Sequence, residues 1–167
     1  AYRAQNVRPL EIATSRGRLY NMIPPTQGMS ALAILGIFDR LGVTDGEGFA
    51  HIHGLIEATK QAFLVRNAEL GDPRYMRHDP QELLSDARLD AMAGAIDPAR
   101  AAPWPQVAKA GDTIWMGAAD ADGTVVSFIQ SVFWEFGSGL TCPQTGVVFQ
   151  NRGAGFSLEA GPNRLAP

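Results

Sequence analysis

The hydrophobic pattern of this chain changes from helical to strand-like near residue 113, and this change constrains the fold more than any other feature. Before it, residues 29–41 and 49–70 carry apolar side chains at intervals of three and four, the period of an α-helix. After it, β-branched and aromatic residues gather in short runs separated by turn residues. Because helices and strands do not alternate regularly, we predict an α+β fold in which helices pack on a largely antiparallel sheet.

Turn and capping residues divide the first part of the chain. Residues 8–13 and 18–22 flank the sequence Thr-Ser-Arg-Gly at residues 14–17, which predicts a β-hairpin. Thr26 supplies a hydroxyl N-cap for the first helix, and Gly42 follows the last residue of that helix as a C-terminal signal. We therefore expect a hairpin followed by a capped, buried helix.

The second predicted helix, residues 49–70, is amphipathic. Glu57 lies off its apolar face, which consists of six residues: Ile52, Leu55, Ile56, Ala62, Phe63 and Leu70. These apolar residues are therefore expected to face the core, and Glu57 is not.

The part of the chain that follows has two regions of different character. In residues 75–110, Asp79-Pro80 opens a predicted short helix through Leu84, Asp97-Pro98 breaks a second one, and Pro103 and Pro105 extend the chain. This region is therefore expected to form a tether rather than core. Residues 113–119 and 124–131 flank a turn rich in aspartate and glycine, which predicts a second hairpin, and residues 147–150 predict a further strand. The aromatic residues of this region are expected to be core residues: Trp115, Phe128, Phe133, Trp134 and Phe136.

Charge and hydropathy exclude several classes of partner. The chain has 14 basic and 17 acidic residues mixed along its length, for a net charge of -3, which is not the pattern of a nucleic-acid or anionic-membrane surface. The longest apolar run, residues 29–38, is well below the roughly 18 residues needed to span a bilayer. Cys142 is the single cysteine, so a reducing compartment is permitted. We expect no nucleic-acid or membrane partner and a cytoplasmic location, with the periplasm as the alternative.

Motifs for phosphate or metal binding are incomplete. The loop containing Gly137 and Gly139 lacks both the third glycine of a dinucleotide-binding loop and the Gly-Lys-Ser/Thr of a P-loop. His51 and His53 are two positions apart on a predicted helix, so their side chains point about 200° apart around its axis and cannot share a metal ion. No metal and no organic cofactor are expected.

Thr113 is a hydroxyl residue at the start of a predicted strand, directly after the tether. If the peptide bond before it were cleaved, its new α-amino group would have a pKa of about 7.7 to 8.0 and could act as a base for the hydroxyl of the same residue. Nucleophile and base would then belong to one residue. A threonine at the start of a strand is common, so this feature alone leaves a structural role open.

Four motifs in order resemble the gamma-glutamyltransferase family of N-terminal-nucleophile hydrolases. They are residues 24–28 (PPTQG), 57–73 (beginning EATKQAF and ending LGDP), 113–123 (TIWMGAADADG) and 136–139 (FGSG). The resemblance implies an αββα sandwich and a zymogen that cleaves itself between Asp112 and Thr113. Residues 1–112 would belong to the end of the large subunit and residues 113–167 to the start of the small subunit, which together form one incomplete domain and stay paired after cleavage.

The chain departs from the transferase pattern around the nucleophile. Ile114 and Trp115 follow Thr113 in place of threonine and histidine, while the second active-site threonine of the family falls on Ser131. Ser131 keeps a hydroxyl for the N-terminal amine, although an ordinary strand-end serine is an equal alternative. Phe133 and Gly155 stand where the family has the asparagine and the aspartate that bind the glutamyl ammonium. Recognition of a γ-glutamyl group is therefore not expected.

Residues 111–116 and 150–157 are more similar to the acylase-like branch of the family, which includes oxamate amidohydrolases and cephalosporin acylases. We therefore predict hydrolysis of a small carboxylate-bearing amide, with Thr113 as nucleophile and base and Ser131 assisting. Asn151, Arg152 and Phe133 are the predicted substrate-binding residues, and Arg152 would anchor the carboxylate unless it only bridges the sheet or lies exposed. The alternatives are γ-glutamyl transfer or glutathione hydrolysis, and a catalytically silent structural segment.

Overall fold

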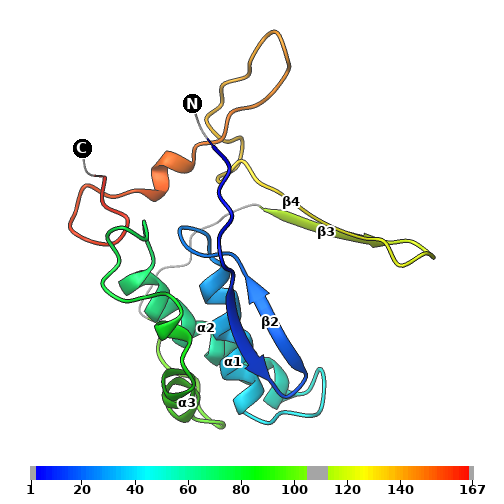
Figure 1. Cartoon of the computed structure of the whole chain (residues 1–167), viewed down its shortest axis with the longest axis vertical. Helices are drawn as coiled ribbons and strands as arrows, with labels where there is room; N and C mark the ends of the chain where they lie inside the picture. Colours follow the sequence, from blue (N-terminus) through cyan, green and yellow to red (C-terminus); the bar gives the residue numbers. More distant parts are fainter. Residues whose placement is uncertain (1–2, 105–112, 166–167) are drawn as a thin grey trace. The chain divides into compact units, whose positions relative to one another are not determined.

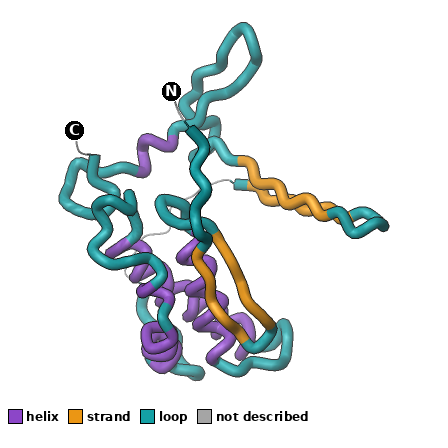
Figure 2. The backbone as a smooth tube through the Cα atoms, viewed as in Figure 1, coloured by secondary structure: helices purple, strands orange, loops and turns teal. Residues whose placement is uncertain are grey.

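A computed structural model of the chain describes residues 3–104 and 113–165. The chain divides into two compact units: Ala1–Trp104 with Ala160–Asn163, and Pro105–Glu159 with Arg164–Pro167. Helices are concentrated in the first unit, and each unit contains one two-stranded sheet (Figures 1 and 2). The predicted combination of helices and antiparallel strands is confirmed. These sheets do not by themselves form a full sandwich.

The first unit begins with the predicted hairpin. β1 (Leu10–Thr14) pairs antiparallel with β2 (Gly17–Asn21), with Ile12 opposite Leu19. Leu10 and Ile12 are buried, and both β1 and β2 pack on α1. The hairpin therefore covers one side of the helical core, as Figure 1 shows.

α1 (Gly28–Arg40) is the central element of this core. Met29, Leu32 and Ile37 are fully buried, and Gly42 follows the helix with a φ of 64°, the left-handed conformation expected after a C-terminus. The predicted N-cap was wrong by one residue. Gln27 is the N-cap, while the Thr26 hydroxyl accepts a hydrogen bond from the Gly28 amide at 3.3 Å.

α2 (Phe49–Glu69) ends one residue before the predicted end, and only Ala62 and Leu70 of its predicted apolar set are buried. Ile52 and Ile56 are 50% and 51% exposed, whereas Glu57 is only 1% exposed. The residues that α2 buries at intervals of four are small: Gly54, Ala58 and Ala62. A Cβ atom at Gly54 would lie 3.0 Å from Leu41 Cδ1, so the small side chains let α1 and α2 approach closely.

The prediction of a tether was wrong for residues 75–104. The short 3₁₀ helix η1 (Glu82–Leu84) and α3 (Asp86–Gly94) follow α2, and their residues Leu83, Leu84 and Leu89 are buried in the core. α3 packs on α1, where Leu89 fills the space beside Gly36. The prolines interrupt helices but do not prevent the leucines between them from being buried. Residues 105–110, the rest of the predicted tether, lie outside the described residues.

The second unit contains the second predicted hairpin. β3 (Ile114–Ala119) pairs antiparallel with β4 (Val125–Gln130), and the Asp120 carboxylate accepts hydrogen bonds from the amides of Asp122 and Thr124 in the turn. These two bonds fix a tight connection between the strands. The predicted strand at residues 147–150 is instead one isolated bridge between Thr141 and Val148.

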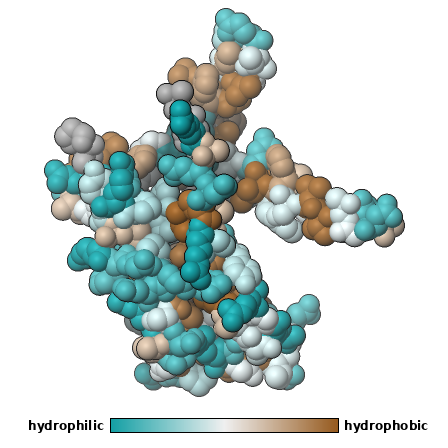
Figure 3. Space-filling model, in the orientation of Figure 1, coloured by the Kyte–Doolittle hydropathy of each residue, from teal (hydrophilic) through white to brown (hydrophobic). Residues whose placement is uncertain are grey.

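The aromatic side chains of this unit are not a core within the described residues. Trp115 is 63% exposed and Phe136 is 84% exposed, and every residue of β3 and β4 is exposed. Hydrophobic residues are accordingly visible on the surface of the hairpin in Figure 3. A two-stranded ribbon buries such side chains only when another layer packs on it, and none of the described residues provides that layer.

Candidate functional site

Thr113 and Ser131 face each other at the open end of the second hairpin. Ile114 pairs with Gln130 in the ladder, so one step further the antiparallel register places Thr113 opposite Ser131. The Thr113 Oγ1 hydroxyl donates a hydrogen bond of 2.8 Å to Ser131 Oγ. The two hydroxyl residues selected from the sequence are therefore brought together by strand register.

Ser131 Oγ also accepts a hydrogen bond of 3.0 Å from the Phe133 amide. A serine hydroxyl has two acceptor positions and one donor hydrogen. The Thr113 hydroxyl and the Phe133 amide use both acceptor positions, which leaves the Ser131 O–H free to donate to a third group. This arrangement suits a hydroxyl that interacts with a nearby amine or with a developing negative charge.

Phe133 adopts a backbone conformation that is uncommon for a residue with a side chain. Its φ is 82°, in the left-handed region that favours glycine. The bend directs the amide of Phe133 to Ser131, and its ring stacks on Trp134 with a centroid separation of 5.7 Å. A Cβ atom at Gly155 would lie 3.3 Å from Phe133 Cζ, so the ring lies directly against this glycine.

Asn151 and Arg152 reach the same bend from the other side of the second unit. The Asn151 amide donates to the Val132 carbonyl at 3.2 Å, and Asn151 Oδ1 accepts from the Trp134 amide at 3.0 Å. Asn151 therefore holds the main chain on both sides of Phe133. These bonds position the main chain at the bend, and the predicted contact of Asn151 with substrate stays a prediction.

Arg152 begins the short 3₁₀ helix η2 (Arg152–Gly155). Its Nη2 atom lies 3.5 Å from the Ser131 carbonyl oxygen, and its Cζ lies 5.5 Å from the centroid of the Phe133 ring. The side chain is exposed, and no carboxylate of the described residues lies within ion-pair distance of it. Its donors are thus available to an external anion.

The structure brings together all the predicted site residues that it describes: Thr113, Ser131, Phe133, Asn151 and Arg152. Asp112, the predicted partner of Thr113 in self-cleavage, lies outside the described residues. The main-chain groups of Val132 and Trp134 also belong to this cluster, and the sequence analysis missed them. Side-chain identity contains no signal for a contact that a main-chain group makes.

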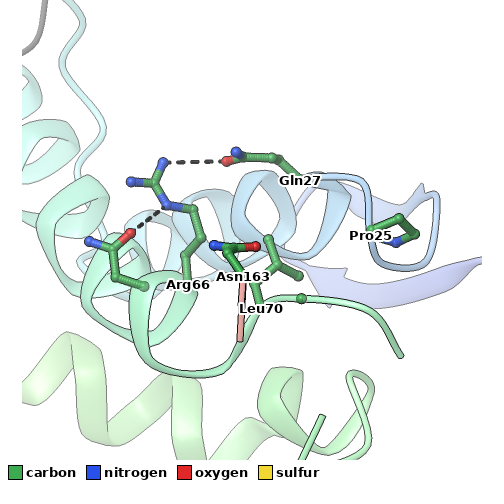
Figure 4. A pocket seen from close by; sticks show the side chains of 7 residues that line it. Pro25, Gln27, Arg66, Leu70 and Asn163 are labelled. Carbon is green, nitrogen blue, oxygen red and sulfur yellow. Dashed lines mark hydrogen bonds between the residues drawn. The ribbon is translucent and has the colours of Figure 1, made fainter. Parts of the chain in front are cut away.

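A separate polar pocket lies in the first unit, with a volume of about 250 Å³. Arg66 donates to the Asn67 side-chain oxygen at 3.0 Å and to the Gln27 side-chain oxygen at 3.3 Å (Figure 4). Burial lowers the pKa of Arg66 from its ordinary value, and the guanidinium stacks 3.6 Å from the centroid of the Phe63 ring. These contacts are with neutral partners, and the pocket contains none of the predicted catalytic residues.

Among residues 3–104 and 113–165, no three histidine, cysteine, aspartate or glutamate side chains group closely enough to bind a metal ion. None of the helices in the described part of the chain has the length and apolar character needed to cross a membrane.

Comparisons with known proteins extend over the whole chain. The family model described as gamma-glutamyltranspeptidase matches residues 1–167. The chain is 49% identical over 159 residues to the oxamate amidohydrolase proenzyme of Klebsiella pneumoniae subsp. pneumoniae, covering 95% of this chain and 30% of the relative. It is 36% identical over 165 residues to the glutathione hydrolase-like YwrD proenzyme of Bacillus subtilis, again covering 95% of this chain and 30% of the relative.

A solved structure is similar over the same extent. The cephalosporin acylase from Bacillus halodurans superimposes with a TM-score of 0.80 and 34% sequence identity, covering 99% of this chain and 30% of that chain. The chain thus spans about 30% of the length of the curated relatives and of the solved structure that it matches.

Proposed function

The chain belongs to the gamma-glutamyltranspeptidase family, as its motifs predicted, and from this premise we propose that it is part of a longer N-terminal-threonine amidohydrolase. The observation that supports this most directly is the 2.8 Å hydrogen bond between the Thr113 and Ser131 hydroxyls, at the start of the strand that follows the proposed cleavage point. The relatives named proenzymes are consistent with a precursor that is processed.

The proposed maturation is an acyl shift at the bond between Asp112 and Thr113. The Thr113 hydroxyl oxygen attacks the carbonyl carbon of Asp112, the peptide C–N bond breaks as an ester C–O bond forms, and the hydroxyl proton passes to the released nitrogen. Water then hydrolyses the ester, which leaves a carboxyl group on Asp112 and a free α-amino group on Thr113. The Ser131 hydroxyl holds the attacking oxygen through the hydrogen bond between the two side chains.

In the mature enzyme, the same oxygen attacks the substrate amide. The α-amino group of Thr113 accepts the hydroxyl proton and returns it to the leaving amine, so an acyl ester forms on Thr113 and ammonia or an amine is released. Water hydrolyses that ester and regenerates the hydroxyl. When the Thr113 proton passes to the α-amine, Ser131 Oγ can accept a hydrogen bond from an N–H of that amine beside the Phe133 amide, and the Ser131 O–H donates to the developing oxyanion.

The substrate class that we propose is a small amide bearing a carboxylate. The exposed Arg152 guanidinium next to the Ser131 carbonyl supports this, since its planar donors match a carboxylate. An oxamate-type amide combines both groups in one small molecule, and it is the substrate class named for the Klebsiella relative. The alternative, hydrolysis of a γ-glutamyl compound, is supported by the name of the Bacillus subtilis relative.

The same proposal includes the architecture of the whole protein. We infer that residues 1–112 end the large chain and residues 113–167 begin the small chain of one αββα sandwich, and that the two chains stay associated after cleavage. The similarity to the cephalosporin acylase structure over nearly the whole chain supports this arrangement. Within it, the exposed apolar side chains of β3 and β4 would be covered by residues outside this chain.

Intact-mass analysis of the full-length protein tests the proposal. Wild type should yield two polypeptides whose masses correspond to cleavage before Thr113, and T113A should stay as one polypeptide because it lacks the attacking oxygen. T124A, which removes a hydroxyl at the opposite end of the same hairpin, should process normally. Cleavage of T113A at the same bond would refute Thr113 as the nucleophile, and faster hydrolysis of a γ-glutamyl anilide than of oxamate would refute the proposed substrate.

A further inference from the structure

Phe133 and Gly155 are in direct contact although 22 positions separate them in the sequence, from 133 to 155. A Cβ atom at Gly155 would lie 3.3 Å from Phe133 Cζ and 3.8 Å from Cε2, which is closer than most real Cβ contacts for the first of these atoms. A side chain at Gly155 would require the ring to shift by a few tenths of an ångström. The glycine therefore permits the ring to lie where it does, without requiring an unusual backbone conformation of its own.

The same ring also contacts Arg152, the first residue of η2. The Arg152 Cζ lies 5.5 Å from the ring centroid, within the range of a cation–π interaction, and Nη2 reaches towards the Ser131 carbonyl. The Ser131 hydroxyl in turn binds both Thr113 and the Phe133 amide. Through these contacts, the ring joins the guanidinium to the hydroxyl pair.

We propose that Phe133 and Gly155 form a selectivity element, in which the ring lies against the glycine and orients the Arg152 guanidinium for the carboxylate of a short amide substrate. This inference rests on the proposed function and identifies the residues that decide which amides the site accepts. Phe133 and Gly155 are positioning residues, because they act through Arg152.

The chemistry of the ring explains the direction of selectivity. A phenylalanine ring and a glycine offer no hydrogen-bond acceptor to a substrate ammonium, whereas an oriented guanidinium offers two parallel donors to a carboxylate. A flexible arginine loses side-chain conformational entropy when it binds a substrate. Contact with the Phe133 ring, which packs against Gly155, restricts Arg152 beforehand and so reduces this loss. The element therefore favours small anionic amides over neutral or cationic ones.

The test compares two pairs of variants in the full-length, self-processed protein. G155V places a branched side chain against the ring, while G153V makes the same change in the same 3₁₀ helix where nothing lies within 4 Å. F133L removes the ring face, while F136L makes the same change at another left-handed position, where the residue is 84% exposed. Each variant is assayed with oxamate, which carries a carboxylate, and with oxamide, its neutral analogue of similar size.

We expect G155V and F133L to raise KM for oxamate by about tenfold, the effect of losing one oriented charge-assisted interaction, and to change kcat/KM for oxamide by less than about twofold. G153V and F136L should keep the wild-type ratio between the two substrates. Equal oxamate-to-oxamide ratios in G155V and G153V, or in F133L and F136L, would overturn the inference. If G155V is not processed, the phenylalanine pair alone decides.

The same samples separate this inference from the function on which it rests. Wild-type protein that is not cleaved before Thr113, or that hydrolyses neither amide, would overturn the proposed function and the inference with it. Wild-type protein that hydrolyses oxamate while its preference is unchanged in both variant pairs would overturn the inference alone.

Discussion

At the scale of single residues, the chain places two hydroxyl groups, those of Thr113 and Ser131, next to the Phe133 amide. Thr113 Oγ1 and Ser131 Oγ are 2.8 Å apart, and the Phe133 amide occupies the second acceptor position of Ser131. Such a pair is able to hold a nucleophile in one rotamer before the substrate arrives, which is one source of preorganisation. Ser131 should therefore matter for reactivity more than for stability.

We expect S131A to lower the rate of self-cleavage and the kcat for amide hydrolysis by roughly a hundred- to a thousandfold, the range found for removal of one oxyanion-stabilising donor. S131T should retain most activity because it keeps the hydroxyl. S127A, which removes the hydroxyl that accepts from Trp115 Nε1 within the hairpin, is the matched control. Activities of S131A and S127A that agree within twofold would contradict a role for Ser131.

Glu57 is the buried charge of the first unit. Its carboxylate is almost fully buried and pairs with Lys60 Nζ at 2.6 Å, and it also accepts from the Ala102 amide at 3.1 Å. Lys60 donates to the Ala102 carbonyl at 2.7 Å. Desolvation raises the pKa of Glu57, but the hydrogen bonds from Lys60 and Ala102 outweigh it, so that the pKa is lowered from the ordinary value of 4.5.

The pKa of Glu57 is lower in the folded protein than in the unfolded chain, so the charged carboxylate stabilises the fold at any pH above its ordinary pKa. This stabilisation is lost as the pH falls through the lowered pKa of the folded state. E57Q should therefore lower the free energy of unfolding by about 3 kcal/mol at pH 7 and should weaken the acid dependence of stability. Denaturant unfolding of the full-length protein at pH 7 and pH 4 measures both effects. E47Q changes an exposed glutamate and should change neither, while identical profiles for E57Q and E47Q would contradict this account.

At the scale of secondary-structure elements, side-chain size decides which face of α2 is buried. Gly54, Ala58 and Ala62 lie at intervals of four and are buried, while the larger Ile52 and Ile56 are half exposed. Close approach of α1 and α2 buries main chain and small side chains, and it leaves no room for branched side chains between the helices. The larger apolar residues Ile52 and Ile56 therefore lie on the side of α2 that faces away from α1.

A58L should destabilise the protein by about 1 to 3 kcal/mol, because a leucine at a position with 0% exposure would force α1 and α2 apart. A68L makes the same substitution on an exposed position of the same helix and should change stability by less than about 0.5 kcal/mol. Denaturation midpoints of the two full-length variants provide the comparison. A midpoint for A58L equal to that of A68L would show that the interface is not tightly packed.

At the scale of the whole molecule, the compact units do not follow the order of the chain. Ala160–Asn163 belongs to the first unit although it comes after Thr113. A Cβ atom at Gly71 would overlap the Pro162 carbonyl oxygen, which shows how closely these two segments pack. With the proposed cleavage before Thr113, this contact would join the large chain to the small chain.

We expect G71A to weaken the association of the two chains after self-cleavage, because the added methyl group has no space beside Pro162. Size-exclusion chromatography of the processed full-length protein in increasing urea should show separation of the chains at lower urea than in wild type. G46A adds the same methyl group where nothing lies within 4 Å and is the control. If the two chains of G71A separate only at the urea concentration at which those of G46A separate, this contact is not part of the interface.

The sequence by itself determined the local elements and the candidate site residues. Turn signals at residues 14–17 and 120–123 predicted both hairpins, and a C-terminal glycine predicted the end of α1. Motif order predicted the family, and the family model matches the whole chain. These features depend on residue type and near neighbours along the chain, so that sequence patterns contain them. The roles of the site residues, the domain boundary at residue 113 and the cytoplasmic location stay predictions.

Only the tertiary structure decided which surfaces meet. It placed Phe133 against Gly155 and Arg152, assigned Asn151 to the main chain beside Phe133, and buried Leu83, Leu84 and Leu89 in a region where prolines suggested a tether. It also turned the small residues of α2 inward. The physical reason is that burial and packing depend on what lies across the contact, and a partner distant in sequence leaves no trace in the local pattern of either segment.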